Sequence, residues 1–218
     1  MKEKKPEILE IFGLDGISIG RQERNEFYAE IRKEYKQTNR ITRQVRVVRF
    51  LLMTSDGRIY IQKRSHKKRD NSGLYDKTVG GHVKAGYSAD MAAIMECQEE
   101  LAIPGMVLAD ADFEAVRDDI DLSVIGIMQK IEQMNRNMSI RQSADGSSIN
   151  QPLITSFYVG YYNGSLRFKD GESTGVETFS LDELESLMRK EPERFTEDLR
   201  FMINRFRDYL VPLKDYRR

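Results

Sequence analysis

The sequence predicts an α/β (α+β) protein in which strands and amphipathic helices alternate along the chain. Runs rich in apolar and β-branched residues that end at glycine-rich or polar turns are typical of strands, and they occur in both halves of the chain. Segments whose apolar residues lie three and four positions apart are typical of helices, and they separate these runs.

Composition narrows the classes of partner. A chain of 218 residues is long enough for one substantial domain or for a domain with an elaboration. It carries 35 Lys+Arg and 35 Asp+Glu residues, so its formal charge is zero and it offers no global field for a nucleic-acid polymer or an anionic membrane. We therefore expect neither partner, and any phosphate group must be held by a local cluster of cations.

Cysteine usage and the first residues indicate the compartment. The single cysteine, Cys97, excludes an intrachain disulfide and fits a reducing environment. The N-terminal residues are basic but no apolar run follows them, so they predict no secretory signal. No stretch of the sequence has the length needed to cross a bilayer. We expect a cytoplasmic protein.

Residues 1–40 predict an N-terminal hairpin followed by a helix. Two short apolar runs, 8–12 and 17–19, flank the turn-rich residues 13–16, which is typical of a β-hairpin. Apolar side chains then recur at helical spacing over residues 22–35, so a short helix is expected there.

Residues 41–105 and 153–218 carry the signals of a main sheet and its helices. The first region predicts strands at 46–53, 58–62 and 75–83, a basic loop at 65–73 and a helix at 88–101. The second predicts a strand at 153–162 and helices at 181–190 and 196–210.

Residues 106–152 predict a helical insertion followed by a polar loop. A long inserted helix is expected over 112–138, because apolar residues recur there in alternating threes and fours: Phe113, Val116, Ile120, Val124, Ile127, Ile131, Met134 and Met138. This stripe can pack on the protein's own core, or it can form the contact of a homodimer. Residues 139–152 are polar and are expected to form a mobile loop.

Three glutamates stand out on the helix predicted at 88–101. Glu96, Glu99 and Glu100 are three and four positions apart, so their carboxylates share one face. Like charges at this spacing repel by roughly a few tenths of a kcal/mol per pair. A hard divalent cation such as Mg²⁺ or Mn²⁺ would relieve that repulsion. The alternative is a solvated acidic face without a ligand, because Glu-x-x-Glu-Glu alone is common.

The context of these glutamates resembles the Nudix box, Gly-x5-Glu-x7-Arg-Glu-U-x-Glu-Glu-x-Gly-U, where U is an aliphatic residue. Residues 81–103 match it without gaps at Gly81, at the three glutamates and at the final Ile103. Cys97 occupies the first U position, which implies a buried core residue and not a nucleophile.

Three positions depart from the box. Tyr87 replaces its first Glu, Met95 replaces its Arg and Ala102 replaces its last Gly. In the family, the Glu and the Arg support each other and orient the metal-binding carboxylates. Their joint loss resembles the removal of a pair, because the loss of one alone would strand a charge. The three glutamates remain while their support has changed, so we expect the catalytic rate to be affected more than metal binding. A Nudix-fold binding module without turnover is the alternative that these departures favour.

Segments outside the box resemble the branch of the family related to isopentenyl-diphosphate isomerase. They comprise the hairpin at 8–20, residues 59–65, 73–76 and 78–83, and the closing residues 176–184 and 193–196. The resemblance covers most of the chain except residues 112–151. It implies the Nudix fold, an α/β/α sandwich around a mixed sheet.

The resemblance implies hydrolysis and not isomerisation. The isomerase needs a cysteine two residues before the histidine of its Gly-His pair, where this chain has Gly80. Its metal cage also uses several histidines, whereas this chain has only His66 and His82. We therefore expect an enzyme that hydrolyses the diphosphate linkage of a small, nucleoside diphosphate-linked substrate with Mg²⁺ or Mn²⁺. An isopentenyl-diphosphate isomerase is the less favoured alternative.

The resemblance also implies roles for individual residues. The metal is expected on Glu96, Glu99 and Glu100 together with the Gly81 carbonyl. Either Glu99 or Glu100 is expected to be the catalytic group that accepts the proton of the attacking water.

Four further residues carry expectations about the substrate and the metal. Arg64 and Lys68 match positions that hold the diphosphate in the isomerase branch, and a guanidinium suits phosphate. His82 is either a metal ligand or a hydrogen-bonded turn histidine. Glu177 is either an acidic site residue or a member of a surface ion pair.

Overall fold

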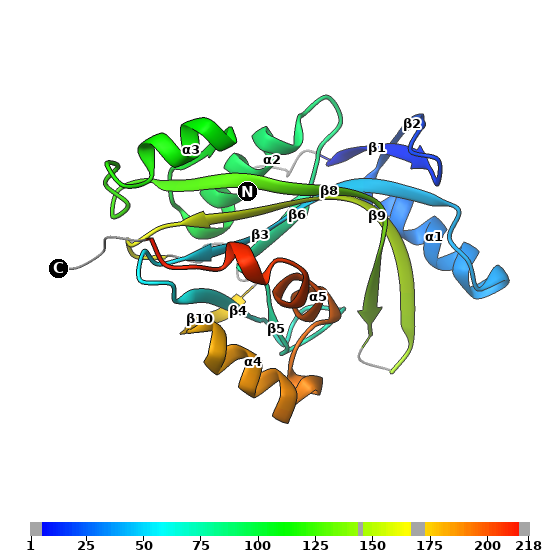
Figure 1. Ribbon diagram of the computed structural model, residues 1–218. Helices are drawn as coiled ribbons and strands as arrows, with labels where there is room; N and C mark the ends of the chain where they lie inside the picture. The colour runs from blue at the N-terminus through cyan, green and yellow to red at the C-terminus, as the bar shows by residue number, and fades with distance from the viewer. Residues whose placement is uncertain (1–5, 144–145, 167–172, 214–218) are drawn as a thin grey trace, which may run out of the picture.

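The computed structural model of the chain describes residues 6–143, 146–166 and 173–213. Its centre is a mixed sheet whose main path follows the order β10–β4–β3–β9–β8–β7 (Figure 1). These strands are β10 (Ser173–Phe179), β4 (Ile59–Arg64), β3 (Arg43–Met53), β9 (Ser148–Tyr161), β8 (Gly126–Gln142) and β7 (Gly105–Leu108). The pairs β3–β9 and β7–β8 are parallel, and the other pairs along this path are antiparallel.

Four shorter strands extend the sheet. β5 (Tyr75–Asp76) pairs with β4, and β6 (Val79–His82) pairs with β3. β1 (Ile8–Gly13) and β2 (Ser18–Glu23) form the expected N-terminal hairpin, which β1 joins to the first residues of β3. The expected helix follows as α1 (Arg24–Thr38), and it packs on β1 and β3 in an apolar cluster of its own.

Helices cover both faces of the sheet, which confirms the predicted sandwich. α2 (Ala89–Glu96) lies on one face, and α4 (Leu181–Lys190) and α5 (Glu197–Arg205) lie on the other (Figure 1). Side chains of β3 alternate between these layers, as the two-residue period of a strand requires: Leu52 packs toward α2 and Leu51 toward α5.

Three short helical turns complete the helices. A π-helical turn, η1 (Cys97–Leu101), continues α2, and a 3₁₀ turn, η2 (Pro192–Arg194), follows α4. The helix expected at 196–210 is interrupted, because α5 ends at Arg205 and a separate 3₁₀ turn, η3 (Arg207–Tyr209), follows. Within the described residues, no helix combines the length and apolar character needed to span a membrane.

The long helix predicted over 112–138 is wrong. The structure instead forms a short helix, α3 (Asp110–Val116), and then the 17-residue strand β8. β8 pairs with β9 from Ile127 to Gln142. The apolar stripe that suggested a homodimer contact is therefore not a helix surface, and a homodimer stays a prediction.

Two bulges explain why β8 resembles a helix in the sequence. The register shifts between Lys130 and Glu132 and again between Met134 and Asn137. Each extra residue changes the two-residue alternation of a strand into a spacing of three or four, which is the spacing of a helix. Pairing decided the outcome, because the buried strand β9 needs a hydrogen-bonded neighbour on each edge, and β3 and β8 supply them.

The polar loop predicted over 139–152 is also wrong in its extent. β8 continues to Gln142 and β9 begins at Ser148, so most of this segment is paired strand. The N–H of Ser143 donates to the carbonyl of Ser147 at 2.8 Å, which closes the hairpin. Residues 144 and 145 of the predicted loop lie outside the described residues.

Candidate active site

One cleft of about 890 Å³ gathers the predicted site residues. Its walls come from β3, β6, the end of α2 with η1, the loop after β4, the far end of β8 and the start of α5. All six residues predicted to bind the metal or the substrate line it: Gly81, Glu96, Glu99, Glu100, Arg64 and Lys68. The sequence therefore identified residues that the fold brings to one place.

At the acidic end of the cleft, β6 runs directly against the glutamates. A Cβ on Gly81 would overlap the carboxylate of Glu96, so glycine here lets that carboxylate keep its position against β6. Glu100 is 8% exposed, and its carboxyl shares a hydrogen bond with that of Glu96. Glu99 is exposed, and its Oε1 lies 3.5 Å from Nζ of Lys84.

The acidic end is electrostatically unfavourable as it stands. Burial and the neighbouring Glu99 raise the pKa of Glu96 to about 7, although Lys84 acts in the opposite direction. A divalent cation would relieve both causes, and carboxylates with a backbone carbonyl are the oxygen ligands that Mg²⁺ and Mn²⁺ prefer. The residues present therefore fit such an ion.

The fit does not extend to a preformed cage. Over the described residues, no three His, Cys, Asp or Glu side chains are already gathered closely enough to hold a metal ion. Glu96 and Glu100 contact each other, whereas Glu99 turns toward Lys84. The metal site of three glutamates stays a prediction, and it requires Glu99 to turn inward.

Local sequence explains how the glutamates are presented. Ser88 caps α2, and its hydroxyl accepts the N–H of Met91 at 3.1 Å. The helix then widens into the π turn η1, a distortion that is frequent at functional sites. Ala102 ends this turn in the left-handed conformation, with φ 59°, at the position where the box has glycine.

Of the two residues that replace the charged box pair, Tyr87 lies at the acidic end and Met95 is not among the residues that line the cleft. Tyr87 lines the cleft and is partly exposed, and Met95 is half-buried on α2. Neither supplies the charge that the box pair would bring. Lys84, from the loop between β6 and α2, is the cation that contacts Glu99 here.

The predicted diphosphate-binding residues stand at the opposite, basic end. Arg64 ends β4, and its Nη1 donates to Oδ2 of Asp76 at 3.0 Å while its Nη2 donates to the Asp70 carbonyl at 3.1 Å. Its Nε is buried and has no partner within the described residues. Lys68 lines the cleft from the loop that follows. Much of the Arg64 fork is therefore already engaged in holding the site together.

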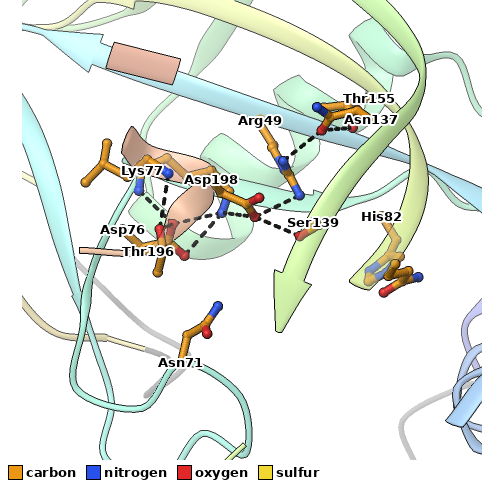
Figure 2. Close-up of polar contacts among 12 residues, drawn as sticks. Arg49, Asn71, Asp76, Lys77, His82, Asn137, Ser139, Thr155, Thr196 and Asp198 are labelled. Atoms are coloured by element: carbon orange, nitrogen blue, oxygen red, sulfur yellow. Dashed lines mark hydrogen bonds and ion pairs between the residues drawn. The ribbon is translucent and has the colours of Figure 1, made fainter. Parts of the chain in front are cut away.

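A buried polar network at this end was missed in the sequence. Arg49, on β3 and only 3% exposed, donates to Oδ1 of Asn137 at 3.1 Å and pairs with Oδ2 of Asp198 at 2.8 Å (Figure 2). The hydroxyl of Ser139 donates to the same Asp198 carboxylate at 3.1 Å. The network thus ties β3, β8 and α5 together beneath the cleft.

The network continues to Asp76 (Figure 2). Its Oδ1 accepts from Nζ of Lys77 at 3.0 Å and from the hydroxyl of Thr196 at 2.8 Å. Burial acts to raise the pKa of Asp76, but the adjacent Lys77 and Arg64 outweigh it and hold the pKa well below its usual range. Asp76 is therefore an ionised anchor for the cations around it.

Two signals could have revealed these residues. Arg49 interrupts an apolar strand, and a charge there requires a buried partner. Asn137, Ser139 and Arg141 alternate along β8, so they face one side together. The predicted helix and loop concealed this alternation.

His82 is hydrogen-bonded, as one of its two predicted roles requires, although it lies in strand β6 and not in a turn, and its role as a metal ligand stays a prediction. It is buried in β6, and its Nε2 shares a hydrogen bond of 2.6 Å with the hydroxyl of Tyr28. Burial, followed by Arg24, Arg141 and Arg49, lowers its pKa well below the usual value, so the ring is neutral. Its ring is therefore held by α1 while it lines the cleft.

Two other predictions concern residues away from the chemistry. Cys97 is buried between α2 and the sheet, and burial raises the pKa of its thiol, so it is a core residue as expected. Glu177, on β10, accepts a hydrogen bond from the Tyr75 hydroxyl at 2.7 Å. It is exposed and is not among the residues that line the cleft.

Sequence comparisons place this arrangement among known proteins. The family model described as NUDIX domain matches residues 42–199. The uncharacterized Nudix hydrolase SCO1686 of Streptomyces coelicolor is 38% identical over 64 residues, which make up 29% of this chain and 35% of that protein. The chain thus aligns with about a third of that relative.

Solved structures with similar folds agree. DR0079 from Deinococcus radiodurans superposes with a TM-score of 0.61 at 19% identity, covering 91% of this chain and 98% of that one. A bifunctional NMN adenylyltransferase/ADP ribose pyrophosphatase from Francisella tularensis gives a TM-score of 0.49 at 16% identity, covering 85% of this chain and 46% of that one. At 19% identity the likeness to DR0079 concerns the fold alone, and nothing is concluded from the second superposition. Because the family match covers well over half of the chain, this protein belongs to the Nudix family.

Proposed function

We propose that this protein is a hydrolase that cleaves the diphosphate linkage of a small, nucleoside diphosphate-linked substrate with Mg²⁺ or Mn²⁺. The observation that carries the proposal is the facing pair of Glu96 and Glu100, packed on Gly81 inside a cleft whose other end is basic. Such a cleft suits a ligand that carries phosphates and needs a cation at one end.

The proposed roles follow from the two ends of the cleft. Glu96, Glu99, Glu100 and the Gly81 carbonyl would hold the metal, which would polarise a phosphoryl oxygen and lower the pKa of bound water. Either Glu99 or Glu100 accepts the proton of the attacking water. Arg64 orients the diphosphate through the N–H donors that its bonds to Asp76 and Asp70 leave available.

Lys68 adds a second charge to the proposed diphosphate site. It lines the cleft from the same loop that follows Arg64. A flexible ammonium beside a planar guanidinium can follow the charge on the departing phosphate, because the two cations differ in reach and geometry.

The test is a substrate screen with Mg²⁺ and with Mn²⁺. Nucleoside diphosphate sugars, dinucleoside polyphosphates, (d)NTPs and coenzyme-linked diphosphates are incubated with the protein, and phosphate-containing products are separated. Release of two phosphate-bearing products, lost in Glu100→Gln, supports the proposal. If none of these substrate classes is hydrolysed with either metal, the proposal is contradicted.

A Nudix-fold binding module without turnover is the second candidate. Tyr87 and Met95 favour it, because they remove the charged pair that orients the metal-binding glutamates in the family. Calorimetry separates the two candidates: a binding module should take up a diphosphate ligand with Mn²⁺ and release it unchanged.

Isomerisation needs its own control. Gly80 supplies no acid where the isomerase has its cysteine. Incubation with isopentenyl diphosphate should therefore give no dimethylallyl diphosphate, and accumulation of that product would contradict a hydrolytic site.

A further inference from the structure

Arg141 is held firmly over the basic end of the cleft. It lies on β8 between two anchored neighbours. Ser139 donates to Asp198 at 3.1 Å on one side. On the other side, the N–H of Asn71 donates to the carbonyl of Gln142 at 2.8 Å, and the N–H of Gln142 donates to Oδ1 of Asn71 at 3.0 Å. The backbone that carries Arg141 is thus fixed before any ligand arrives.

Among the residues that the structure describes, the guanidinium of Arg141 has no hydrogen-bonding partner. Its Nε is wholly buried without an acceptor, and among the described residues the side chain donates no hydrogen bond and forms no ion pair. It stacks over the ring of Tyr28, with Cζ 5.4 Å from the ring centroid. The face of an aromatic ring offsets only part of the cost of burying a cation, so the N–H donors of Arg141 still need a hydrogen-bond acceptor.

The carboxylates around Arg141 cannot fill this role because each already pairs with another cation. Arg49 pairs with Asp198 at 2.8 Å, Arg64 with Asp76 at 3.0 Å, and Arg32 with Asp70 at 3.4 Å. Lys77 also bonds to Asp76. With Arg141 included, five cations of the described part of the chain therefore face three carboxylates, an excess of two positive charges among these eight groups.

This excess lies apart from the acidic end. The groups whose charges raise the pKa of Arg141 are Tyr28, Asp198, Asp70 and Asp76. The groups that shift the pKa of Glu96 are different ones: Glu99, Lys84, Glu100 and Glu7. The two sets share no residue, although both belong to one cleft of about 890 Å³. A cleft of that size accommodates a ligand much larger than a diphosphate alone.

We propose that Arg141 anchors a further anion site at the basic end, next to the diphosphate site of Arg64 and Lys68, and that it binds a phosphate group of the substrate additional to the diphosphate that is cleaved. A planar guanidinium can donate two parallel hydrogen bonds to a phosphate, and the excess charge favours a doubly charged group. The proposal rests on the proposed function for the position of the scissile diphosphate. It adds that the preferred substrates carry a further phosphate.

Binding without metal tests the anion site independently of catalysis. Calorimetry in EDTA is carried out with inorganic phosphate and with NAD⁺ and NADP⁺, which differ by one phosphate remote from the diphosphate bond. The parent protein should bind phosphate and should prefer NADP⁺. Arg141→Gln should weaken phosphate binding about tenfold or more, as expected for a charged hydrogen bond, and should abolish the preference. Arg141→Lys should recover part of both.

A matched control removes the same charge elsewhere on β8. Arg136 is exposed, donates to the Leu14 carbonyl and does not line the cleft, so Arg136→Gln should bind phosphate as the parent does. Equal weakening by Arg136→Gln would show a general charge effect and overturn the site. So would undiminished binding in Arg141→Gln, or equal affinity of the parent for NAD⁺ and NADP⁺.

The outcomes also separate this proposal from the proposed function. Glu99→Gln should leave phosphate binding in EDTA intact, because Glu99 belongs to the acidic end. If binding depends on Arg141 but no substrate is hydrolysed, the anion site holds and the hydrolase proposal fails. If hydrolysis is found and phosphate binding ignores Arg141, the reverse is true.

Discussion

The acidic and basic ends of the cleft are built in different ways. The acidic end lies within residues 81–103, on one strand, one loop and one helix. The basic end joins Arg49 of β3, Arg141 of β8 and Asp198 of α5. The residues of the acidic end have a fixed spacing in the sequence, so a motif can identify them. The residues of the basic end are far apart in the sequence and come together only when their elements pack.

This difference predicts opposite responses to mutation. Carboxylates that repel one another add little to stability, so changes at the acidic end should affect chemistry and spare the fold. Paired charges that tie three elements together are structural, so changes at the basic end should destabilise the protein.

The largest expected effect is on turnover at the acidic end. Glu100→Gln should lower kcat about 10³-fold, within the range of about 10²–10⁴ typical of a lost acid–base group. Calorimetry should show weaker Mn²⁺ binding by this variant and by Glu99→Gln. Stability in urea should hold or rise, because one of two facing carboxyls becomes neutral.

Glu177→Gln is the matched control for that prediction. It neutralises an exposed carboxyl outside the cleft, whose partner is the Tyr75 hydroxyl. Its kcat should equal that of the parent. An equal loss in both proteins, or unchanged Mn²⁺ affinity in both acidic-end variants, would remove the assignment.

The same contrast explains how much the sequence could predict. The hairpin at the N-terminus and the helices α1, α2 and α4 follow from local spacing and turn chemistry, and the structure confirms them. The resemblance to the Nudix box singled out residues that line one cleft, and their roles stay predictions. Strand β8 could not be predicted from local spacing, because its bulges interrupt the two-residue alternation of a strand. Beside the cleft, moreover, its polar side chain is buried and its apolar side chains are exposed. There Ser139 is buried, whereas Met138 and Ile140 are 49% and 40% exposed. Long-range pairing with β9 decided this strand, and a single sequence carries little trace of such pairing.

The second prediction concerns stability at the basic end. Asp198→Ala should lower the free energy of unfolding by about 3 kcal/mol, because it leaves Arg49 buried without its carboxylate. Urea denaturation measures this change. The exposed pair of Arg117 and Glu114 provides the comparison, since Glu114→Ala should cost less than about 1 kcal/mol. Similar losses in the two variants would show that the Arg49 network is not structural.

The third prediction is a pH dependence at the same end. The pKa of Asp76 is held below the unfolded value of 3.8, so its ionised form stabilises the fold above about pH 4, and this contribution is lost as pH falls further toward the folded pKa. Asp76→Asn should be less stable than the parent at neutral pH. Between pH 5 and pH 2, however, the free energy of unfolding of the parent should fall by about 2 kcal/mol more than that of the variant. Parallel pH curves for parent and variant would contradict this assignment.

The fourth prediction returns to the missing box pair. Tyr87→Glu with Met95→Arg should raise kcat/KM about fivefold, or ~1 kcal/mol, by restoring mutual support for the glutamates. Each single change should give less than its share, because it introduces an unpartnered charge. The four proteins of this cycle are compared on a substrate from the screen. A folded double variant no faster than the parent would show that the pair does not limit the site.

The smallest expected effect concerns Ala102, which stands where the box has glycine, and it should change stability without changing catalysis. Ala102 adopts φ 59° and ψ 30°, where its Cβ crowds the following carbonyl, and a glycine there would relieve the strain. Ala102→Gly should raise the free energy of unfolding by ~0.5–1 kcal/mol, after allowance for the greater freedom of glycine in the unfolded chain. Asn39→Gly is the comparison, because Asn39 ends α1 at φ 55° and asparagine tolerates this conformation better than alanine, so its gain should be smaller. Urea unfolding of both variants measures the difference, and kcat should not change in either. A loss of stability in Ala102→Gly would mean that the alanine methyl is held by contacts worth more than the strain, and the departure from the box at this position would then be a packing feature.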